Sequence, residues 1–180
     1  LVPPPPPGEE EFEQLAVREP LLYQPNIDDF NRRLKLLITP MRSDNTYGPT
    51  YQHIMEALTL PERMQEEVAR CVVEFRSRGA NFLLAAVDVA NPHLPPHNKR
   101  LICSGQMLKV KNADNDKTEY KVKIAQGFVQ MKAHTDINRM FECVFLQSKT
   151  NTAPRSYNFL ADSVRSRDTI ILTLRSIANQ

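Results

Sequence analysis

Residues 101–130, LICSGQMLKVKNADNDKTEYKVKIAQGFVQ, carry the pattern that gives the best lead to function. Apolar and polar side chains alternate over residues 101–111 and again over residues 118–130, as in half-buried strands. Between these stretches lies the polar segment 113–117, Ala-Asp-Asn-Asp-Lys, whose residue types favour a turn. The segment therefore predicts a β-hairpin.

The predicted hairpin separates apolar from basic side chains by parity. The apolar set expected to face the core is Leu108, Val110, Tyr120, Val122 and Ile124. The opposite face receives four lysines: Lys109, Lys111, Lys121 and Lys123. Because like charges across a strand pair are destabilising, four lysines on one face favour an anionic partner. The predicted polyanion-binding patch is extended by Lys99, Arg100 and Lys132. The alternative is a solvated edge on which lysine blocks strand pairing.

Two kinds of polyanion would bind such a cluster of basic residues. Nucleic-acid backbones attract clustered Lys and Arg, and so do anionic membrane surfaces. Single-stranded nucleic acid would also need exposed aromatic side chains for stacking. Aromatic residues are only 7% of the chain and Trp is absent, so recognition by base stacking is disfavoured. Contact with a nucleic-acid backbone or an acidic membrane remains.

The charge of the whole chain supports this division. The net charge of the 180 residues is only +2, but it is unevenly distributed. Residues 1–98 carry 9 basic and 14 acidic side chains, whereas residues 99–180 carry 14 and 7. Halves of opposite sign suit head-to-tail self-association. The sequence thus predicts an acidic first half and a basic second half.

Residues 26–79 have the apolar spacing of two to three helices. Asn26 is a candidate cap for a first helix, which Pro40 would end, and residues 49–58 form a short second one. The third begins at the capping-box pattern Thr59-Leu60-Pro61-Glu62 and ends before Gly79. Its apolar stripe is Met64, Val68, Cys71, Val72 and Phe75.

Residues 80–180 are predicted to form strands. Residues 81–90 are nearly all apolar, as expected of a central strand. Further strand candidates are residues 139–147, 157–164 and 169–177, although residues 169–174 could instead begin a helix. The predicted fold is α+β: two to three N-terminal helices packed on a C-terminal, mostly antiparallel sheet of about five to six strands. We expect one such domain over residues 26–180.

Residues 1–25 are expected to form a proline-rich and acidic arm ahead of that domain. Its partner-binding candidates are the unbroken run Pro3, Pro4, Pro5, Pro6 and Pro7, followed by Phe12. Five consecutive prolines favour an extended polyproline II helix. Such a segment is either a linker or a preformed ligand for an aromatic groove.

Neither a metal nor a catalytic site is predicted. Three cysteines without a CxxC pair favour reduced thiols and an intracellular location, cytoplasmic or nuclear. Pro95 and Pro96 separate His93 from His97, so no helix presents the two imidazoles to a metal. Cys103 with His93 or His134 is the remaining candidate for a thiol nucleophile and its base. No cofactor and no small-molecule substrate are expected.

The leading functional hypothesis is a non-enzymatic assembly or adaptor domain. It would bind a polyanion through the basic hairpin and protein partners, or a second copy of itself, through its arm. A proline-rich tail ahead of a compact basic α+β domain resembles the layout of matrix proteins of enveloped negative-strand viruses, which implies a structural role at a membrane. The alternatives are a pure protein-interaction subunit of a larger complex and a Cys-dependent enzyme.

Overall fold

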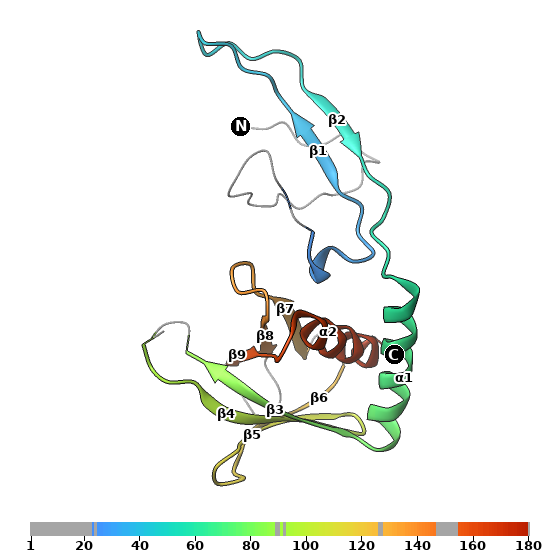
Figure 1. The fold of residues 1–180 in the computed structure, drawn as a ribbon, viewed down its shortest axis with the longest axis vertical. Coiled ribbons are helices and arrows are strands. Elements are labelled where there is room, and N and C mark those ends of the chain that lie inside the picture. Colours follow the sequence, from blue (N-terminus) through green and yellow to red (C-terminus); the bar gives the residue numbers. More distant parts are fainter. Residues whose placement is uncertain are drawn as a thin grey trace. The chain divides into compact units, whose positions relative to one another are not determined.

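The computed structural model describes residues 23, 25–88, 91, 93–125, 128–146 and 155–179 of the 180-residue chain. The chain divides into two compact units at Thr59 and Leu60. Each unit is described by itself below, and Figure 1 shows the course of the chain through both.

The described part of the first unit is a short turn followed by a β-hairpin. The 3-10 helix η1 spans Ile27–Asp29, and β1 (Lys35–Ile38) pairs antiparallel with β2 (Tyr51–Ile54). Asn26 caps η1, and the buried Asp29 carboxylate accepts hydrogen bonds from the Asn26 backbone and from the Tyr23 hydroxyl. The hairpin is therefore anchored by a local polar turn.

The two helices predicted for this region are wrong. Asn26 does cap, but the helix stops after one turn because Asn31 adopts a left-handed backbone with φ of 61°. Residues 35–38 and 51–54 then pair as strands, with Leu37 opposite Gln52. The apolar spacing that suggested a helical face belongs instead to a ribbon with apolar side chains on both faces.

The described residues of the second unit form two helices and seven strands. Helix α1 spans Glu62–Ser77 and is followed by β3 (Ala80–Val87), β4 (His97–Ser104), β5 (Met107–Asn112) and β6 (Thr118–Lys123). Strands β7 (Val129–Ala133), β8 (Met140–Phe145) and β9 (Arg155–Leu160) precede helix α2 (Val164–Ala178). All pairs are antiparallel, in the order β6-β5-β4-β3-β9-β8-β7.

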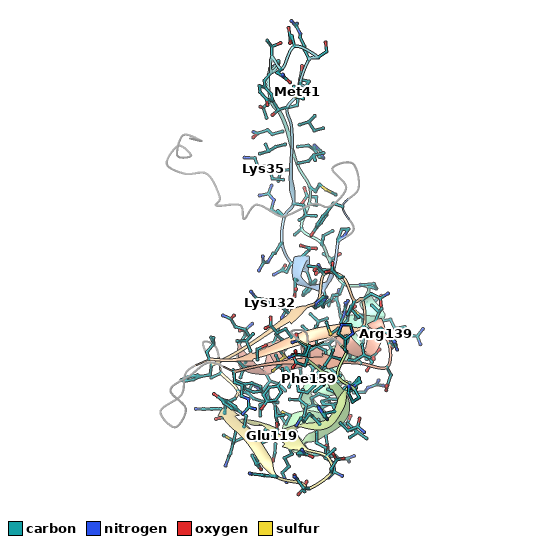
Figure 2. The ribbon with its side chains drawn as sticks, turned by 90° about the vertical axis from the view of Figure 1, so that its left-hand side faces the viewer. Lys35, Met41, Glu119, Lys132, Arg139 and Phe159 are labelled. Carbon is teal, nitrogen blue, oxygen red and sulfur yellow. The ribbon has the colours of Figure 1, made fainter. Side chains whose placement is uncertain are left out.

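Strands β3 and β9 join two halves of the sheet, β6-β5-β4-β3 and β9-β8-β7. The core of this unit lies between these two halves. The largest fully buried aromatic side chains are Phe141, Phe145 and Phe159, and Figure 2 shows Phe159 in the interior. Leu101, Leu108 and Val110 fill the other side from β4 and β5. Helix α2 packs on β7, β8 and α1 through its buried apolar face, as Figure 1 shows.

The predicted fold of N-terminal helices on a C-terminal sheet of five to six strands is therefore wrong. One helix precedes the sheet, the sheet has seven strands, and a helix follows it. Helix α1 lies where the third helix was predicted, but its N-cap is Pro61 without a side-chain cap, so the expected capping box is not formed.

The strand prediction for residues 101–111 fails, and the choice left open at residues 169–174, strand or helix, is decided in favour of the helix. The segment expected as one strand over residues 101–111 is interrupted by a turn at Gly105, whose φ is 59°, and it belongs to both β4 and β5. The C-terminal segment is a helix because Ser163 caps it, its side chain accepting from the Ser166 backbone N–H at 3.0 Å. All six residues of TIILTL, 169–174, are buried in this helix, and so is Ile177.

Candidate functional site: a basic sheet face and a strand-end cavity

The outward side of β4, β5 and β6 gathers five basic side chains into one surface. Cross-strand pairing sets Lys109 directly opposite Lys121, Lys123 opposite Met107, and Lys111 opposite Arg100. The intervening side chains of β5 and β6 are buried in the core, so the lysines point away from it. We call this surface the outer lysine face; it consists of Arg100, Lys109, Lys111, Lys121 and Lys123.

The charges on this face are only partly compensated. Asp116, in the β5–β6 turn, lies 2.8 Å from Lys111 and 3.3 Å from Arg100. The hydrogen bond and the charge of Lys111, with the charge of Arg100, hold the pKa of Asp116 below its ordinary value. Within the part of the chain that the structure describes, Lys109, Lys121 and Lys123 have no ion-pair partner.

Apolar side chains border the same face. Leu83 lies opposite Arg100 on β3 and is 63% exposed, and Ile102 lies opposite Lys109 on β4. A surface that mixes unpaired lysines with an exposed leucine is suited to an interface that is both charged and partly apolar.

Lys99 belongs to a different site, because it points into the unit. It lies on the same side of β4 as the buried Leu101 and forms an ion pair with Glu119. Glu119 is the extra residue of a β-bulge, since Lys111 pairs with Thr118 and Val110 pairs with Tyr120. A bulge re-aims the side chain of its extra residue. Here it turns a carboxylate inward to meet Lys99.

A cavity of about 480 Å³ opens beside this ion pair, where β3 ends and β4, β6 and β9 begin. We call it the strand-end cavity; the lining residues that matter chemically are Asp88, His97, Lys99, Glu119, Arg155 and Tyr157. Tyr157 donates a hydrogen bond of 3.3 Å to Glu119, and the Arg155 guanidinium lies 5.2 Å above the centre of the Tyr157 ring. Burial above all raises the pKa of Tyr157 to about 12, so its hydroxyl remains a donor.

Lys132 lies apart from both sites. It points outward from β7, at the other end of the strand order from β6, and faces Glu142 across the β7–β8 pair. Figure 2 shows Lys132 and Glu119 on different sides of this unit. The structure therefore distributes the seven basic residues proposed from the sequence over three places, with five on the outer lysine face.

The structure gives little support to thiol chemistry at Cys103. Its side chain is buried, and burial raises the pKa of the thiol, which disfavours the reactive thiolate. His134 is engaged elsewhere, since its Nδ1 accepts from the backbone N–H groups of Asp136 and Ile137. The described residues contain no group of three or more His, Cys, Asp and Glu side chains that could hold a metal ion.

Four of these residues of the strand-end cavity were not identified from the sequence: Asp88, Glu119, Arg155 and Tyr157. Glu119 looks like an ordinary solvent-facing position, because only the bulge reverses its direction. Arg155 and Tyr157 become neighbours of Glu119 only through the folding of β9 against β3. The proposed arm residues Pro3–Pro7 and Phe12 lie outside the described residues.

No helix within the described ranges is both long and apolar enough to cross a bilayer. No family model matches the sequence, and no curated protein matches it.

Among solved structures, the chain is similar to the PH domain from TgAPH, with 16% identity over 64% of this chain and 90% of that one, and a TM-score of 0.41. It is also similar to the Slm1-PH domain in complex with D-myo-inositol-4-phosphate, with 12% identity over 56% of this chain and 95% of that one, and a TM-score of 0.42. A third structure contains human RhoA with the DH/PH fragment of PDZRHOGEF, at 13% identity and a TM-score of 0.43. In that case the match covers 54% of this chain but only 27% of the other. None of these three structures is a viral matrix protein.

Proposed function

We propose that residues 60–180 form a non-enzymatic binding module that attaches to acidic membrane surfaces through the outer lysine face. The observation that carries the proposal is the set of Lys109, Lys121 and Lys123, which share one face without a compensating carboxylate among the described residues. Like charges held opposite each other reduce the stability of a sheet. A negatively charged partner removes that penalty.

An acidic membrane fits this face better than a nucleic acid does. Each basic residue near an anionic bilayer contributes about 1 kcal/mol of attraction. Leu83, exposed next to Arg100, can enter the interfacial region of a bilayer. Nucleic acid would gain nothing comparable from Leu83, and the neighbouring Tyr120 is buried and therefore cannot stack on bases. The proposed setting is the cytoplasmic surface of a membrane, where anionic lipids are concentrated.

Cosedimentation with vesicles tests the proposal. We expect the protein to bind vesicles of phosphatidylcholine mixed with phosphatidylserine and to dissociate from them as the salt concentration rises. It should not bind vesicles of pure phosphatidylcholine. Reversing Lys109, Lys121 and Lys123 to Glu removes at least about 3 kcal/mol of attraction, or roughly a hundredfold in affinity.

Duplex DNA of matched charge concentration provides the competing arm of this experiment. Stronger binding to the duplex than to the acidic vesicles would contradict the membrane proposal. So would unchanged vesicle binding by the triple variant, provided that its circular dichroism spectrum and unfolding midpoint remain those of a folded protein.

A second candidate function is protein binding through the β1–β2 hairpin, either to a protein partner or to a second copy of this chain. Eight large apolar side chains between residues 36 and 55 are exposed: Leu36, Leu37, Ile38, Met41, Tyr47, Tyr51, Ile54 and Met55. They project from both faces of a two-stranded ribbon, along which Figure 2 labels Lys35 and Met41. An isolated hairpin is marginally stable in water, so a covering partner would stabilise it.

Sedimentation velocity over a concentration series tests self-association by this hairpin. We expect a wild-type dimer that is weakened by Leu37→Thr, which leaves the folded monomer intact because Leu37 is 58% exposed. Gln52→Thr, directly across the pair, is the control and should leave the dimer unchanged. A protein that is monomeric at every concentration would contradict self-association.

A further inference from the structure

We infer that the strand-end cavity is a second anion site, selective for phosphate monoesters, and that Glu119 is a built-in competitor occupying the ligand's place. The site is distinct from the outer lysine face, because Lys99 points into the unit whereas Lys109 and Lys121 point out of it. The existence of this site therefore does not depend on the proposed membrane attachment.

Three basic groups converge on the cavity from two strands. His97 and Lys99 come from the start of β4, and Arg155 comes from the start of β9. The Tyr157 hydroxyl adds a neutral donor on the β9 side. A guanidinium, an ammonium, an imidazole and a hydroxyl form a donor set suited to phosphate oxygens.

Glu119 already satisfies part of this donor set. One carboxylate oxygen pairs with Lys99, whose side chain is 13% exposed, and the other accepts from the Tyr157 hydroxyl. Arg155, by contrast, lies over the ring of Tyr157. Its guanidinium N–H groups are not paired with the Glu119 carboxylate, which pairs with Lys99. The Glu119 carboxylate thus holds the Lys99 ammonium and the Tyr157 hydroxyl in the positions from which they would bind an external anion.

The ligand class follows from charge and size. A phosphate monoester carries about −1.5 to −2 charges at pH 7 and has three strong acceptor oxygens. It can therefore displace a singly charged carboxylate from Lys99 while Arg155 holds its remaining oxygens. A phosphodiester carries one charge and competes less well. A cavity of about 480 Å³ accommodates the phosphate and a small organic group attached to it.

The variant that tests the inference is Glu119→Gln, with glycerol 3-phosphate as the probe in isothermal titration calorimetry. The amide keeps the shape and one acceptor, but it removes the competing charge, so we expect affinity to rise at least about tenfold. Glu142→Gln is the matched control. It makes the same change of charge on β8, where Glu142 accepts from the lining residue Ser156 but does not itself line the cavity, and should leave affinity unchanged.

Two further variants keep the test decisive. Glu119→Ala removes the whole carboxylate that pairs with Lys99 and accepts from Tyr157, and we expect it to tighten binding even if Glu119→Gln fails to fold. Adding Lys99→Met to either variant should abolish binding. Equal tightening by Glu142→Gln, or binding that survives loss of Lys99, would overturn the inference.

Vesicles distinguish a lipid source of the monoester from a soluble one. Phosphatidic acid carries a phosphate monoester, and phosphatidylserine a diester. With surface charge matched, Glu119→Gln should bind phosphatidic acid vesicles more tightly than wild type does if the source is a headgroup. If the source is soluble, the variant should gain affinity for glycerol 3-phosphate and not for these vesicles. An equal gain on phosphatidylserine vesicles would overturn the selectivity for monoesters. Reversal of Lys121 should leave the response to glycerol 3-phosphate intact.

Discussion

The outer lysine face and the strand-end cavity hold basic side chains in opposite ways. On the face, Lys109 and Lys121 stand directly opposite each other on a flat, solvent-exposed ribbon. In the cavity, Lys99 is largely buried and is held by Glu119, which in turn accepts from Tyr157. The same residue type is therefore uncompensated in one region and neutralised in the other.

This difference separates attraction from selectivity. Exposed lysines act over about a Debye length and respond to any dense negative surface. An enclosed lysine that already has a partner accepts only a ligand able to replace that partner. The face is thus suited to bringing the unit to a charged surface, and the cavity to choosing a particular anion there.

The largest expected effect comes from the same substitution made in both regions. Lys99→Met leaves the Glu119 carboxylate partly buried without its cation, and we expect the free energy of unfolding to fall by about 2 kcal/mol. Lys109→Met removes one member of a like-charged pair and should leave stability unchanged or slightly raised. Urea denaturation of both variants measures this difference in the free energy of unfolding. Equal decreases in the two variants would contradict the contrast between the outer lysine face and the strand-end cavity.

A smaller effect is expected from Asp116→Asn, which removes the carboxylate that pairs with Lys111 and Arg100. The outer lysine face then gains one unit of net positive charge, worth about 1 kcal/mol at an acidic bilayer. Binding to phosphatidylserine vesicles should tighten about fivefold. Asp114→Asn, in the same turn but without a described ion pair to the face, should tighten it less.

The smallest effect concerns the stability of the two outermost strands. Lys121→Glu places opposite charges across the β5–β6 pair, whereas Lys132→Glu places two carboxylates across the β7–β8 pair. We expect unfolding free energies to rise by about 0.5 kcal/mol in the first case and to fall by a similar amount in the second. Thermal unfolding at low salt is the measurement, and shifts of the same sign would contradict the assigned registers.

The sequence predicted the β5–β6 hairpin well, because alternation and turn chemistry are local. Leu108, Val110, Val122 and Ile124 are all buried, and the turn falls within residues 113–117. The prediction for residues 26–58 failed because their apolar spacing suits either a helix or a two-faced ribbon, and only Asn31 and the pairing with β2 decide between them. Local propensity was also misleading in α2, whose β-branched residues suggested a strand.

The outer lysine face could be anticipated from parity, whereas the strand-end cavity could not. Parity assumes an unbroken register, and the bulge at Glu119 violates that assumption at one residue. The approach of Arg155 and Tyr157 depends on β9 pairing with β3, about 70 residues earlier in the chain. Such long-range pairing leaves no local signal, so Lys99 was grouped with the surface lysines by sequence proximity alone.

One comparison tests the central claim, that the outer lysine face is the membrane-binding surface. Lys121→Glu and Lys132→Glu change net charge equally, and each alters an exposed, outward-pointing lysine on a strand at one end of the order β6-β5-β4-β3-β9-β8-β7. We predict that Lys121→Glu lowers affinity for phosphatidylserine vesicles roughly tenfold, whereas Lys132→Glu stays within about twofold of wild type. Equal losses in the two variants would show that net charge, and not this face, governs binding.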